Sequence, residues 1–282
     1  MNKSDYAVII LTHGRHDRVY TIDSLRKSGY TGDIYLLCDD EDKQLDLYKE
    51  KYKEKLLVFS KEKYAGKFDK MDNFGNNACV VYARNAVWDF AKKLGLKYFI
   101  VCDDDYTMYR FRIDENQCYR TNIQIKDMDS VFSAYIDFLD KSDIDTVCFS
   151  QDGDFIGGFS NSKISGGYKP YRKMMNLYFF RTDKVLEFKG TINEDLTSSI
   201  TEGVFGKIII TCMMTSLRQN ETQSNKGGLT DIYLELGTYV KSFYSVIAAP
   251  SCVKVALMGD KQMRLHHAVT WKNAVPKIIR EC

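Results

Sequence analysis

Sequence features that mark linkers between domains are scarce in this chain of 282 residues. Only three prolines occur, and no stretch is rich enough in proline, glycine or serine to act as a linker. The apolar run at 7–11 is too short for a signal-peptide core, and no uncharged apolar stretch is long enough to span a membrane. We therefore expect one compact domain over 1–282, in the cytoplasm and without a membrane partner.

Paired cysteines and an excess of one charge are also lacking. The chain has 40 Lys and Arg against 38 Asp and Glu, a net charge of +2. This balance argues against a DNA binder held by charge alone, but it leaves nucleic acid open as a partner. None of the eight cysteines forms a CxxC pair, and several lie inside apolar runs, where cysteine behaves as a small hydrophobic residue. Free thiols in a reducing compartment are expected.

Apolar runs and helical patterns alternate along the first hundred residues. Buried strands are expected at 7–11, 34–38, 56–59 and 98–102. Helices are expected at 17–27, 41–52 and 81–94, and Gly95 stands where the last of these needs a C-cap. This order predicts an α/β fold with a largely parallel, doubly wound central sheet flanked by helices.

The second half has a weaker pattern. A helix is expected at 127–140, and strands at 146–149, 177–180 and 208–213. Glycine pairs bracket a segment at 157–167 that is expected to be flexible, and the polar stretch 218–228 is expected to be a loop. Residues 229–249 are apolar but show a mixed signal, so no element is assigned to them.

Three adjacent carboxylates, Asp103, Asp104 and Asp105, follow directly on the predicted strand at 98–102. In open α/β sheets, ligands bind beyond the carboxyl ends of the strands. Mg²⁺ and Mn²⁺ prefer oxygen ligands and often share them with substrate phosphates, so a metal here would hold a diphosphate as it leaves. A solvated acidic turn is the alternative, and we favour the metal site.

Three short motifs carry a family resemblance: VYARN at 81–85, YFIVC-DDDY at 98–106 and NAVPKI at 273–278. The first two resemble GT-A glycosyltransferases, in which an Ala-Arg-Asn helix start precedes a strand that ends in a DxD motif. All three together look most like the TET-associated glycosyltransferases of phages and some eukaryotes. The resemblance implies a Rossmann-like GT-A fold, with a nucleotide-sugar-binding half at 1–110 and an acceptor-binding half at 111–282.

The resemblance also implies a UDP-sugar donor bound with Mn²⁺ or Mg²⁺. In GT-A folds the end of the first strand meets the nucleotide, which here points to Thr12, His13, Gly14 and Arg15. Gly14 would permit a tight turn, and Arg15 would meet the base or a phosphate. An ordinary strand-to-helix turn with a surface arginine is an equal alternative.

A further donor contact is implied after the second strand, where GT-A folds place an acidic residue near uracil or ribose. Asp39 and Asp40 both follow the strand at 34–38, and a carboxylate can accept hydrogen bonds from an imide or from hydroxyls. A helix N-cap is the alternative for either residue. Arg84, near a helix start, would contact the donor phosphate or brace the acidic triplet.

The segment Asn193-Glu194-Asp195 matches the x-E-D motif of GT-A enzymes. In inverting members, its last carboxylate removes the proton from the acceptor hydroxyl on the face opposite the departing nucleotide. The resemblance assigns this role to Asp195, with Glu194 as second choice, and so favours inversion. An N-cap for a helix beginning at Leu196 is the alternative.

A late histidine completes the metal site in many GT-A enzymes. His266 and His267 are the candidates here, beside Asp103 and Asp105, because a neutral imidazole can join carboxylates on Mn²⁺. Adjacent residues of an extended chain point opposite ways, so only one of the two histidines is expected to be a ligand. A packing histidine is the alternative.

The acceptor side is expected in the segment 166–173, which mixes glycine, aromatic and cationic residues. That composition suits phosphate contact and base stacking. The candidate DNA contacts are Tyr168, Lys169, Tyr171, Arg172 and Lys173. The lysine-rich stretch 49–70 is interpreted as a solvated surface.

These interpretations predict a metal-dependent glycosyltransferase. It would move a glucose-type sugar from a UDP-sugar to the hydroxyl of a 5-hydroxymethylpyrimidine in DNA, in the host cytoplasm if the chain is phage-encoded. A GT-A transferase for saccharide or protein hydroxyls would share the donor site, and a nucleotidyltransferase would need a better phosphate loop than 12–15 provides. A GT-A domain kept only to bind nucleic acid is disfavoured, because the acidic triplet and the late histidines are both present.

Overall fold

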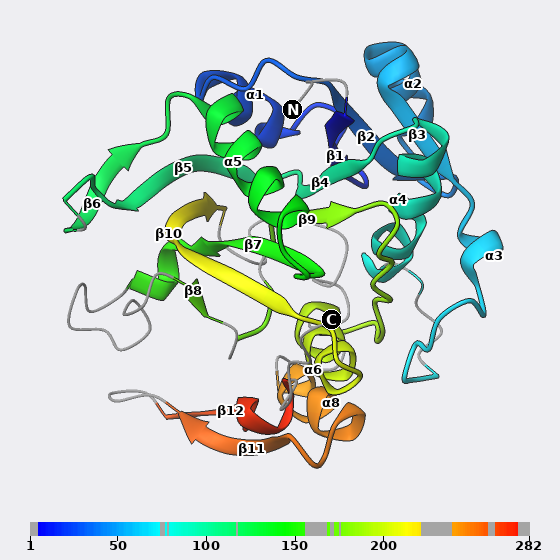
Figure 1. The fold of residues 1–282 in the computed structure, drawn as a ribbon. Helices are drawn as coiled ribbons and strands as arrows, with labels where there is room; N and C mark the ends of the chain where they lie inside the picture. The colour runs from blue at the N-terminus through cyan, green and yellow to red at the C-terminus, as the bar shows by residue number, and fades with distance from the viewer. Residues whose placement is uncertain are drawn as a thin grey trace.

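A computed structural model describes residues 5–73, 77, 79–116, 118–155, 168–169, 172–174, 176–220, 239–258 and 263–275, with only the backbone described at 168–169. Ten strands of these residues form one central sheet (Figure 1). They are β1 (Tyr6–Leu11), β2 (Ile34–Asp39), β3 (Leu56–Phe59), β4 (Tyr98–Asp103), β5 (Tyr106–Ile113), β6 (Tyr119–Gln124), β7 (Thr146–Gln151), β8 (Tyr168–Lys169), β9 (Tyr178–Arg181) and β10 (Ile209–Gln219). A separate hairpin consists of β11 (Val253–Met258) and β12 (Arg264–Val269).

The sheet has the order β3-β2-β1-β4-β9-β7-β10-β5-β6, with β8 paired to β10. The first four strands are mutually parallel, and β7 and β10 are parallel to each other. Along the nine-strand path, β9 and β5 run against the other strands, because each pairs antiparallel with both of its neighbours. The predicted fold class is therefore confirmed: an α/β fold with a largely parallel sheet and the acidic triplet at the end of the central strand β4.

Helices cover both faces of the sheet. They are α1 (Tyr20–Lys27), α2 (Leu45–Tyr52), α3 (Lys61–Tyr64), α4 (Val81–Lys93), α5 (Met128–Asp140), α6 (Glu194–Val204) and α8 (Val240–Ala248), with short 3₁₀ turns η2 (Lys53–Lys55), η3 (Asp152–Phe155) and η5 (Trp271–Asn273). Strand β1 shows how the sequence fixes the layers, since Val8 and Ile10 enter the core beneath α1 and α5, whereas Ile9 and Leu11 enter the core beneath α4. Alternate side chains of a strand point to opposite faces, so a continuous apolar run needs cover on both sides.

The structure differs from the sequence predictions in the polar elements. Strands β5 and β6 were not predicted, because charged residues such as Arg110 and Arg112 interrupt the apolar signal of β5 and every residue of β6 after Tyr119 is exposed. Strand β10 extends to Gln219 and passes a register shift between Cys212 and Ser216, so it takes in the start of the predicted loop at 218–228. The rest of that loop, and the predicted flexible segment beyond Phe155, lie outside the described residues.

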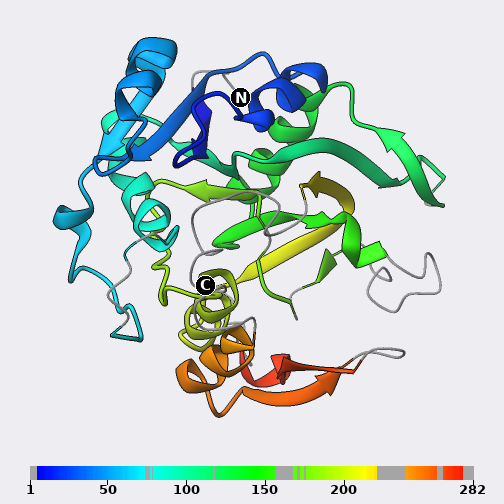
Figure 2. The same ribbon diagram turned by 180° about the vertical axis from the view of Figure 1, so that it is seen from behind.

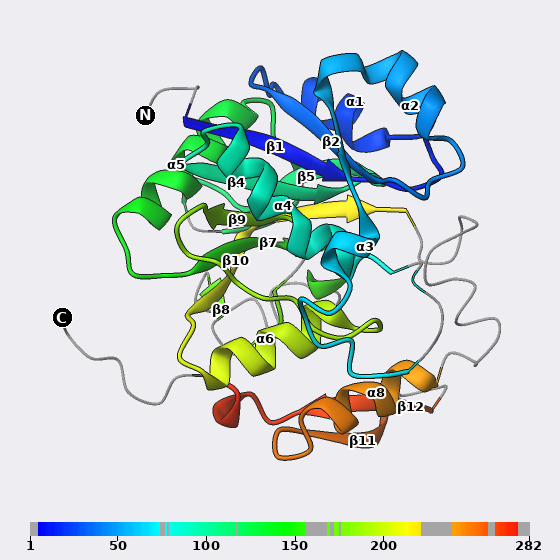
Figure 3. The same ribbon diagram turned by 90° about the vertical axis from the view of Figure 1, so that its right-hand side faces the viewer.

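The C-terminal elements form a layer of their own. The hairpin of β11 and β12 lies apart from the central sheet in opposite views (Figures 1 and 2). Figure 3 shows α6 between the sheet and the layer made by α8 and the hairpin. A small core joins them, with Leu196 and Ile200 of α6, Val253 of β11 and Ala274 after η5. The stretch 229–249, unassigned from sequence, thus contributes α8 to this layer.

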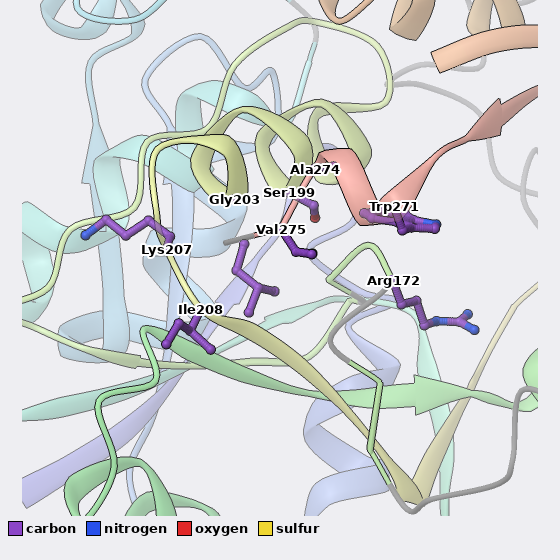
Figure 4. Close-up of a pocket in the computed structure, with 9 residues that line it drawn as sticks. Arg172, Ser199, Gly203, Lys207, Ile208, Trp271, Ala274 and Val275 are labelled. Carbon is purple, nitrogen blue, oxygen red and sulfur yellow. The ribbon is translucent and has the colours of Figure 1, made fainter. Parts of the chain in front are cut away.

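A small pocket of about 30 Å³ marks the seam between α6, the start of β10 and the C-terminal segment (Figure 4). Its lining includes Gly203, Ile208 and Val275, while the charged ends of Arg172 and Lys207 point outward to opposite sides. It lies toward the end of α6 remote from Glu194, so we interpret it as a packing seam rather than as the substrate site.

We expect Gly203→Ala to lower the melting temperature, because a Cβ at this position would stand 2.1 Å from the backbone oxygen of Ala274. Overpacking of this kind typically costs about 1–3 kcal/mol. Differential scanning calorimetry would measure it, with Gly153→Ala as the control, since a Cβ at Gly153 meets no atom within 4 Å. Equal melting temperatures for the two variants would show that the 273–275 segment is not held against α6.

None of the helices in the described part of the chain is long and apolar enough to cross a bilayer.

Candidate donor and catalytic site

The acidic triplet is held in place by helix α1. Thr21 donates its hydroxyl to the backbone oxygen of Asp103 at 2.6 Å and accepts the backbone N–H of Tyr106 at 3.0 Å. The backbone N–H of Thr21 in turn reaches the carbonyl of Asp104 at 3.3 Å. Bonds on both sides of the turn fix the direction in which the three carboxylates leave β4.

Asp104 ties the triplet to the loop after β1. This buried carboxylate accepts the Thr12 hydroxyl at 2.9 Å and Nη1 of Arg15 at 2.7 Å. The phenol of Tyr48 bonds the Thr12 hydroxyl at 2.7 Å and accepts the backbone N–H of Arg15 at 2.8 Å. Both oxygens of Asp104 thus accept hydrogen bonds from the protein. Asp104 was predicted to bind the donor; in this structure it holds the loop at 12–15, the donor loop.

The rest of the loop is closed by two carboxylates, one at the end of β2 and one just after it. Gly14 has the left-handed φ of +67° that the predicted tight turn requires, and its N–H donates to Asp42 at 2.6 Å. His13 bonds Asp39 through Nδ1 at 2.6 Å, and this bond raises the pKa of His13. The buried ammonium of Lys61 lies 2.9 Å from the other oxygen of Asp39.

Asp39 therefore contacts two basic side chains of the protein, His13 and Lys61. Burial acts to raise its pKa, but His13 and Lys61 outweigh burial and lower it below the ordinary value. The neighbouring candidate Asp40 is exposed and accepts the backbone N–H of Lys61 at 3.1 Å. Neither residue is the N-cap of α2, which is Gln44.

Arg84 connects the triplet to the predicted catalytic motif. Its buried guanidinium donates from Nη2 to Asp103 at 2.7 Å, and Nε lies 3.8 Å from Glu194. The guanidinium carbon stands 4.7 Å from the centre of the Tyr178 ring. Nε and Nη1 have no hydrogen-bond partner among the described residues. Of the two roles expected for Arg84, bracing the triplet is the one present in the structure.

Asp105 is the member of the triplet whose negative charge has the least favourable surroundings. Burial, together with the negative charges of Asp103 and Asp104, raises its pKa to about 7. Asp103 also has a raised pKa, since burial outweighs the attraction of Arg84. Carboxylates under such repulsion favour a divalent cation, which would remove the repulsion.

Asp195 lies in the first turn of α6 beside a cation. Its Oδ2 is 2.5 Å from Nζ of Lys173, and its Oδ1 accepts the backbone N–H of Leu196 at 2.7 Å. Burial acts to raise the pKa of Asp195, but Lys173 outweighs it and holds that pKa below the ordinary value. Burial and the charge of Asp195 raise the pKa of Glu194 to about 7. A carboxylate that is ionised at neutral pH is available to receive a proton.

Asn193, rather than Asp195, is the N-cap of α6. It has the left-handed angles φ 54° and ψ 40°, which are uncommon outside glycine. Its Nδ2 donates to the backbone oxygen of Lys241 at 2.6 Å and to the Ser245 hydroxyl at 3.1 Å. Helix α8 therefore fixes the point at which Asp195 enters the site.

The two histidines lie on β12, His266 opposite Ala256 and His267 opposite Val255. Burial, His266 and Lys173 lower the pKa of His267 to about 4, against the pull of Asp195, so His267 is neutral at pH 7. Its Nδ1 is buried without a partner among the described residues, as a metal-binding nitrogen would be. Because Asp195 and Lys173 are among its neighbours, His267 is a better ligand candidate than His266.

The four predicted ligands are not gathered into a ready-made metal site. Among the residues that the structure describes, no three His, Cys, Asp or Glu side chains are grouped to hold an ion. His267 lies in the C-terminal layer, next to Asp195 and Lys173, while Asp103 ends β4 of the central sheet and Asp105 lies in the turn that follows.

Two of the predicted DNA contacts are ion-paired within the protein. Lys173 is paired with Asp195, and Arg172 with the carboxylate of Asp154, so both cations already have anionic partners within the protein. The backbone of Tyr168 and Lys169 forms β8 beside β10. The side chains of those two residues, and Tyr171, lie outside the described residues.

Several residues that build the site gave no signal in the sequence. Tyr48 and Lys61 lie in polar helices whose pattern suggests solvated faces, yet both side chains are buried against the donor loop. Asp42 was not among the predicted site residues, although it follows Asp39 and Asp40 closely in the sequence. The left-handed cap at Asn193 had a weak signal, since asparagine tolerates that conformation better than other non-glycine residues.

Several solved structures are similar to this chain over most of its length. The TarS 1-349 structure from S. aureus in complex with UDP-GlcNAc is 14% identical, with a TM-score of 0.46 over 86% of this chain and 66% of that one. A mannosyltransferase from Pyrobaculum calidifontis, in complex with GDP-Man and Mn²⁺, is 11% identical, with a TM-score of 0.46 over 88% and 73%. Glucosyl-3-phosphoglycerate synthase from Mycobacterium tuberculosis, in complex with Mg²⁺ and UDP, is 10% identical, with a TM-score of 0.46 over 94% and 87%.

These likenesses are distant, and the chain spans only 38% of a longer TarS structure. No curated protein sequence matches the chain. The family comparison is direct, however: residues 6–228, well over half of the chain, match the family described as TET-Associated Glycosyltransferase, and the chain belongs to that family.

Proposed function

We propose that this member of a glycosyltransferase family transfers a sugar from a UDP-sugar to the hydroxymethyl group of a 5-hydroxymethylpyrimidine in DNA. The observation that carries the proposal is Arg84, which joins Asp103 of the triplet to Glu194 of the x-E-D motif. Arg84 thus lies between the carboxylates proposed to hold the leaving diphosphate and the motif proposed to supply the base. Membership of a TET-associated family supports DNA as the acceptor.

The donor would lie over the loop at 12–15 and the triplet. Arg15 is held by Asp104 at 2.7 Å, and about a quarter of its side chain is exposed, so its guanidinium can also reach a phosphate oxygen. Asp103 and Asp105 would hold Mn²⁺ or Mg²⁺, and the neutral His267 is the third candidate. Bound there, the metal would stabilise the negative charge of the departing UDP.

Asp195 would then act as the base. Its carboxylate takes the proton of the acceptor hydroxyl while the hydroxyl oxygen attacks the anomeric carbon of the sugar, and the bond to UDP breaks on the opposite face. This course inverts the anomeric configuration. Lys173, now 2.5 Å from Asp195, must release the carboxylate before the hydroxyl can bind it. Glu194, buried beside Arg84, would hold Asp195 in position and is the second candidate for the base.

A UDP-release assay tests the proposal. With Mn²⁺ and a panel of UDP-sugars, we expect release to rise several-fold when DNA containing 5-hydroxymethyluracil or 5-hydroxymethylcytosine is added, and to stay at the hydrolysis rate with unmodified DNA. Release that responds instead to a saccharide or a peptide would move the acceptor to that class while keeping the glycosyl transfer.

A further inference from the structure

Three amide side chains, those of Gln151, Asn176 and Gln219, meet at one edge of the central sheet and form an amide cluster. Gln151 ends β7, Gln219 ends β10, and Asn176 comes two residues before β9. These strands are neighbours in the sheet, and β9 runs antiparallel to β7, so its start lies at the edge where β7 and β10 end (Figure 1). The fold thus brings together three amides that are distant in the sequence.

The amide cluster lies beside the acidic triplet. Strand β4 ends at the same edge, because β4 and β7 both run antiparallel to β9. Gln219 pairs with Tyr106, the residue after the triplet, and the backbone N–H of Asn220 donates to the backbone oxygen of Asp105 at 3.2 Å. The phenol of Tyr106 donates to the backbone oxygen of Asn176. Two members of the cluster are therefore fixed next to the carboxylates proposed to hold the metal.

Hydrogen bonds within the cluster leave both donors and acceptors for a ligand. Oε1 of Gln219 accepts a hydrogen bond from Nε2 of Gln151 at 3.1 Å and a second from Nδ2 of Asn176. The amide nitrogen of Gln219 and the amide oxygens of the other two make no hydrogen bond to another described residue. All three residues are partly buried. Since an amide carries two N–H donors and an oxygen with two acceptor positions, the cluster can pair with further polar groups.

The cluster itself carries no charge. Arg110 and Arg112 of the neighbouring strand β5 are both paired with Asp152, which follows Gln151 directly. A ligand at the amides would therefore meet neutral donors and acceptors. A hydroxyl group both donates and accepts a hydrogen bond, so a ligand with several hydroxyls suits these partners. An anionic group gains less, because its strongest hydrogen bonds come from cationic donors.

We propose that Gln151, Asn176 and Gln219 select the sugar of the donor, by hydrogen-bonding the hydroxyls of a neutral hexose and thereby favouring it over a sugar acid. A metal ion held by Asp105 would bind the diphosphate directly, and the sugar follows the diphosphate by a single oxygen, so its ring would lie near the cluster. A site that hydrogen-bonds a substrate hydroxyl rejects an analogue that lacks it, because its own polar groups then lose their partner. The inference rests on the proposed UDP-sugar donor and is independent of the acceptor.

The pyrimidine of the acceptor is a less suitable occupant of the cluster. Its edge also offers donors and acceptors that amides can pair with. In an inverting transfer, however, the acceptor approaches the sugar from the face opposite the departing diphosphate. The cluster is attached to Asp105 and Tyr106, on the side where the diphosphate would be held.

Isothermal titration of the full chain in the presence of Mn²⁺ tests the inference. The ligands are UDP, UDP-glucose, UDP-galactose, UDP-glucuronic acid, and analogues of the preferred hexose donor that each lack one hydroxyl. We expect UDP-glucuronic acid and at least one deoxy analogue to bind about tenfold more weakly than that donor. In Gln219→Met, which keeps the length of the side chain but lacks the amide, the preferred donor should lose about tenfold in affinity while UDP binds unchanged. The deoxy analogue that the unaltered chain rejects should lose no further affinity in this variant.

A second variant and a matched control separate selection from general damage. Gln219→Lys places a cation in the cluster, so the ratio of affinities should shift toward UDP-glucuronic acid by about tenfold, which partial unfolding cannot produce. Gln124→Met removes an exposed amide at the end of β6 and should leave all affinities unchanged. Melting temperatures of the variants identify any that do not fold.

The outcomes distinguish this inference from the proposed function. If Gln219→Met and Gln219→Lys leave the order of the donors unchanged, the inference is overturned and the proposed transfer stands. The inference is also overturned if the variants keep donor binding and instead weaken binding of DNA that contains 5-hydroxymethylcytosine, because the cluster would then contact the acceptor. If the donors respond as expected but no sugar reaches DNA, the inference stands and the proposed acceptor is wrong. Absence of UDP binding by the unaltered chain would overturn both the proposed donor and the inference.

Discussion

Asp195→Asn is expected to reduce sugar transfer by about 10²–10⁴-fold while leaving UDP binding unchanged. The amide cannot take the proton of the acceptor hydroxyl. Its oxygen can still accept the N–H of Leu196, so the start of α6 should keep its conformation. Initial rates with saturating donor would measure the loss, and isothermal titration with UDP and Mn²⁺ would show that the donor site is intact.

Two further variants make the result specific. Asp137→Asn removes another carboxylate that is paired with a lysine, at 2.7 Å from Lys141 on the surface of α5, and should leave transfer unchanged. Glu194→Gln should reduce transfer less than Asp195→Asn does. A near-normal rate in Asp195→Asn, or a larger loss in Glu194→Gln, would take the role of base away from Asp195.

Asp105→Ala is expected to abolish metal-dependent UDP binding. In the unaltered chain, UDP and Mn²⁺ at about 100 times their dissociation constant should stabilise the fold by about 2.7 kcal/mol, which raises the melting temperature by roughly 5 °C or more. Asp105 carries a pKa raised to about 7 by burial and by its two neighbours, so its removal should not destabilise the chain without ligand.

Thermal unfolding with UDP alone, Mn²⁺ alone and both together measures the effect. Asp46→Ala is the control, because this carboxylate is almost fully exposed on α2 and should keep the shift. If Asp105→Ala still shows the full shift with UDP and Mn²⁺, the assignment of the metal to the triplet is wrong.

The layers of the fold and the position of the triplet could be predicted from the sequence because they depend on local patterns. Four apolar runs predicted β1 to β4 to within one residue at each end, since the interior of a strand covered on both faces is nearly all apolar. The triplet stands at the end of such a strand, so its place at the edge of the sheet followed. The helix at 81–94 was equally clear and forms α4 at Val81–Lys93.

The partners of the charged residues could not be predicted, because they come from distant parts of the chain. Lys173 looked available for DNA phosphates by composition, yet it pairs with Asp195, 22 residues further on. Asp39 was expected to meet the nucleotide, yet His13 and Lys61 hold it. Such pairings depend on how loops meet across the sheet, which neither periodicity nor spacing records.

Mass spectrometry of nucleosides tests the central claim most directly. The purified chain, Mn²⁺ and a panel of UDP-sugars would be incubated with DNA containing 5-hydroxymethyluracil, 5-hydroxymethylcytosine or neither, and the DNA digested. The account predicts the added mass of one sugar on a hydroxymethylated nucleoside, absent from unmodified DNA and from reactions with Asp195→Asn. UDP released from every donor with no added mass on any nucleoside would contradict DNA as the acceptor.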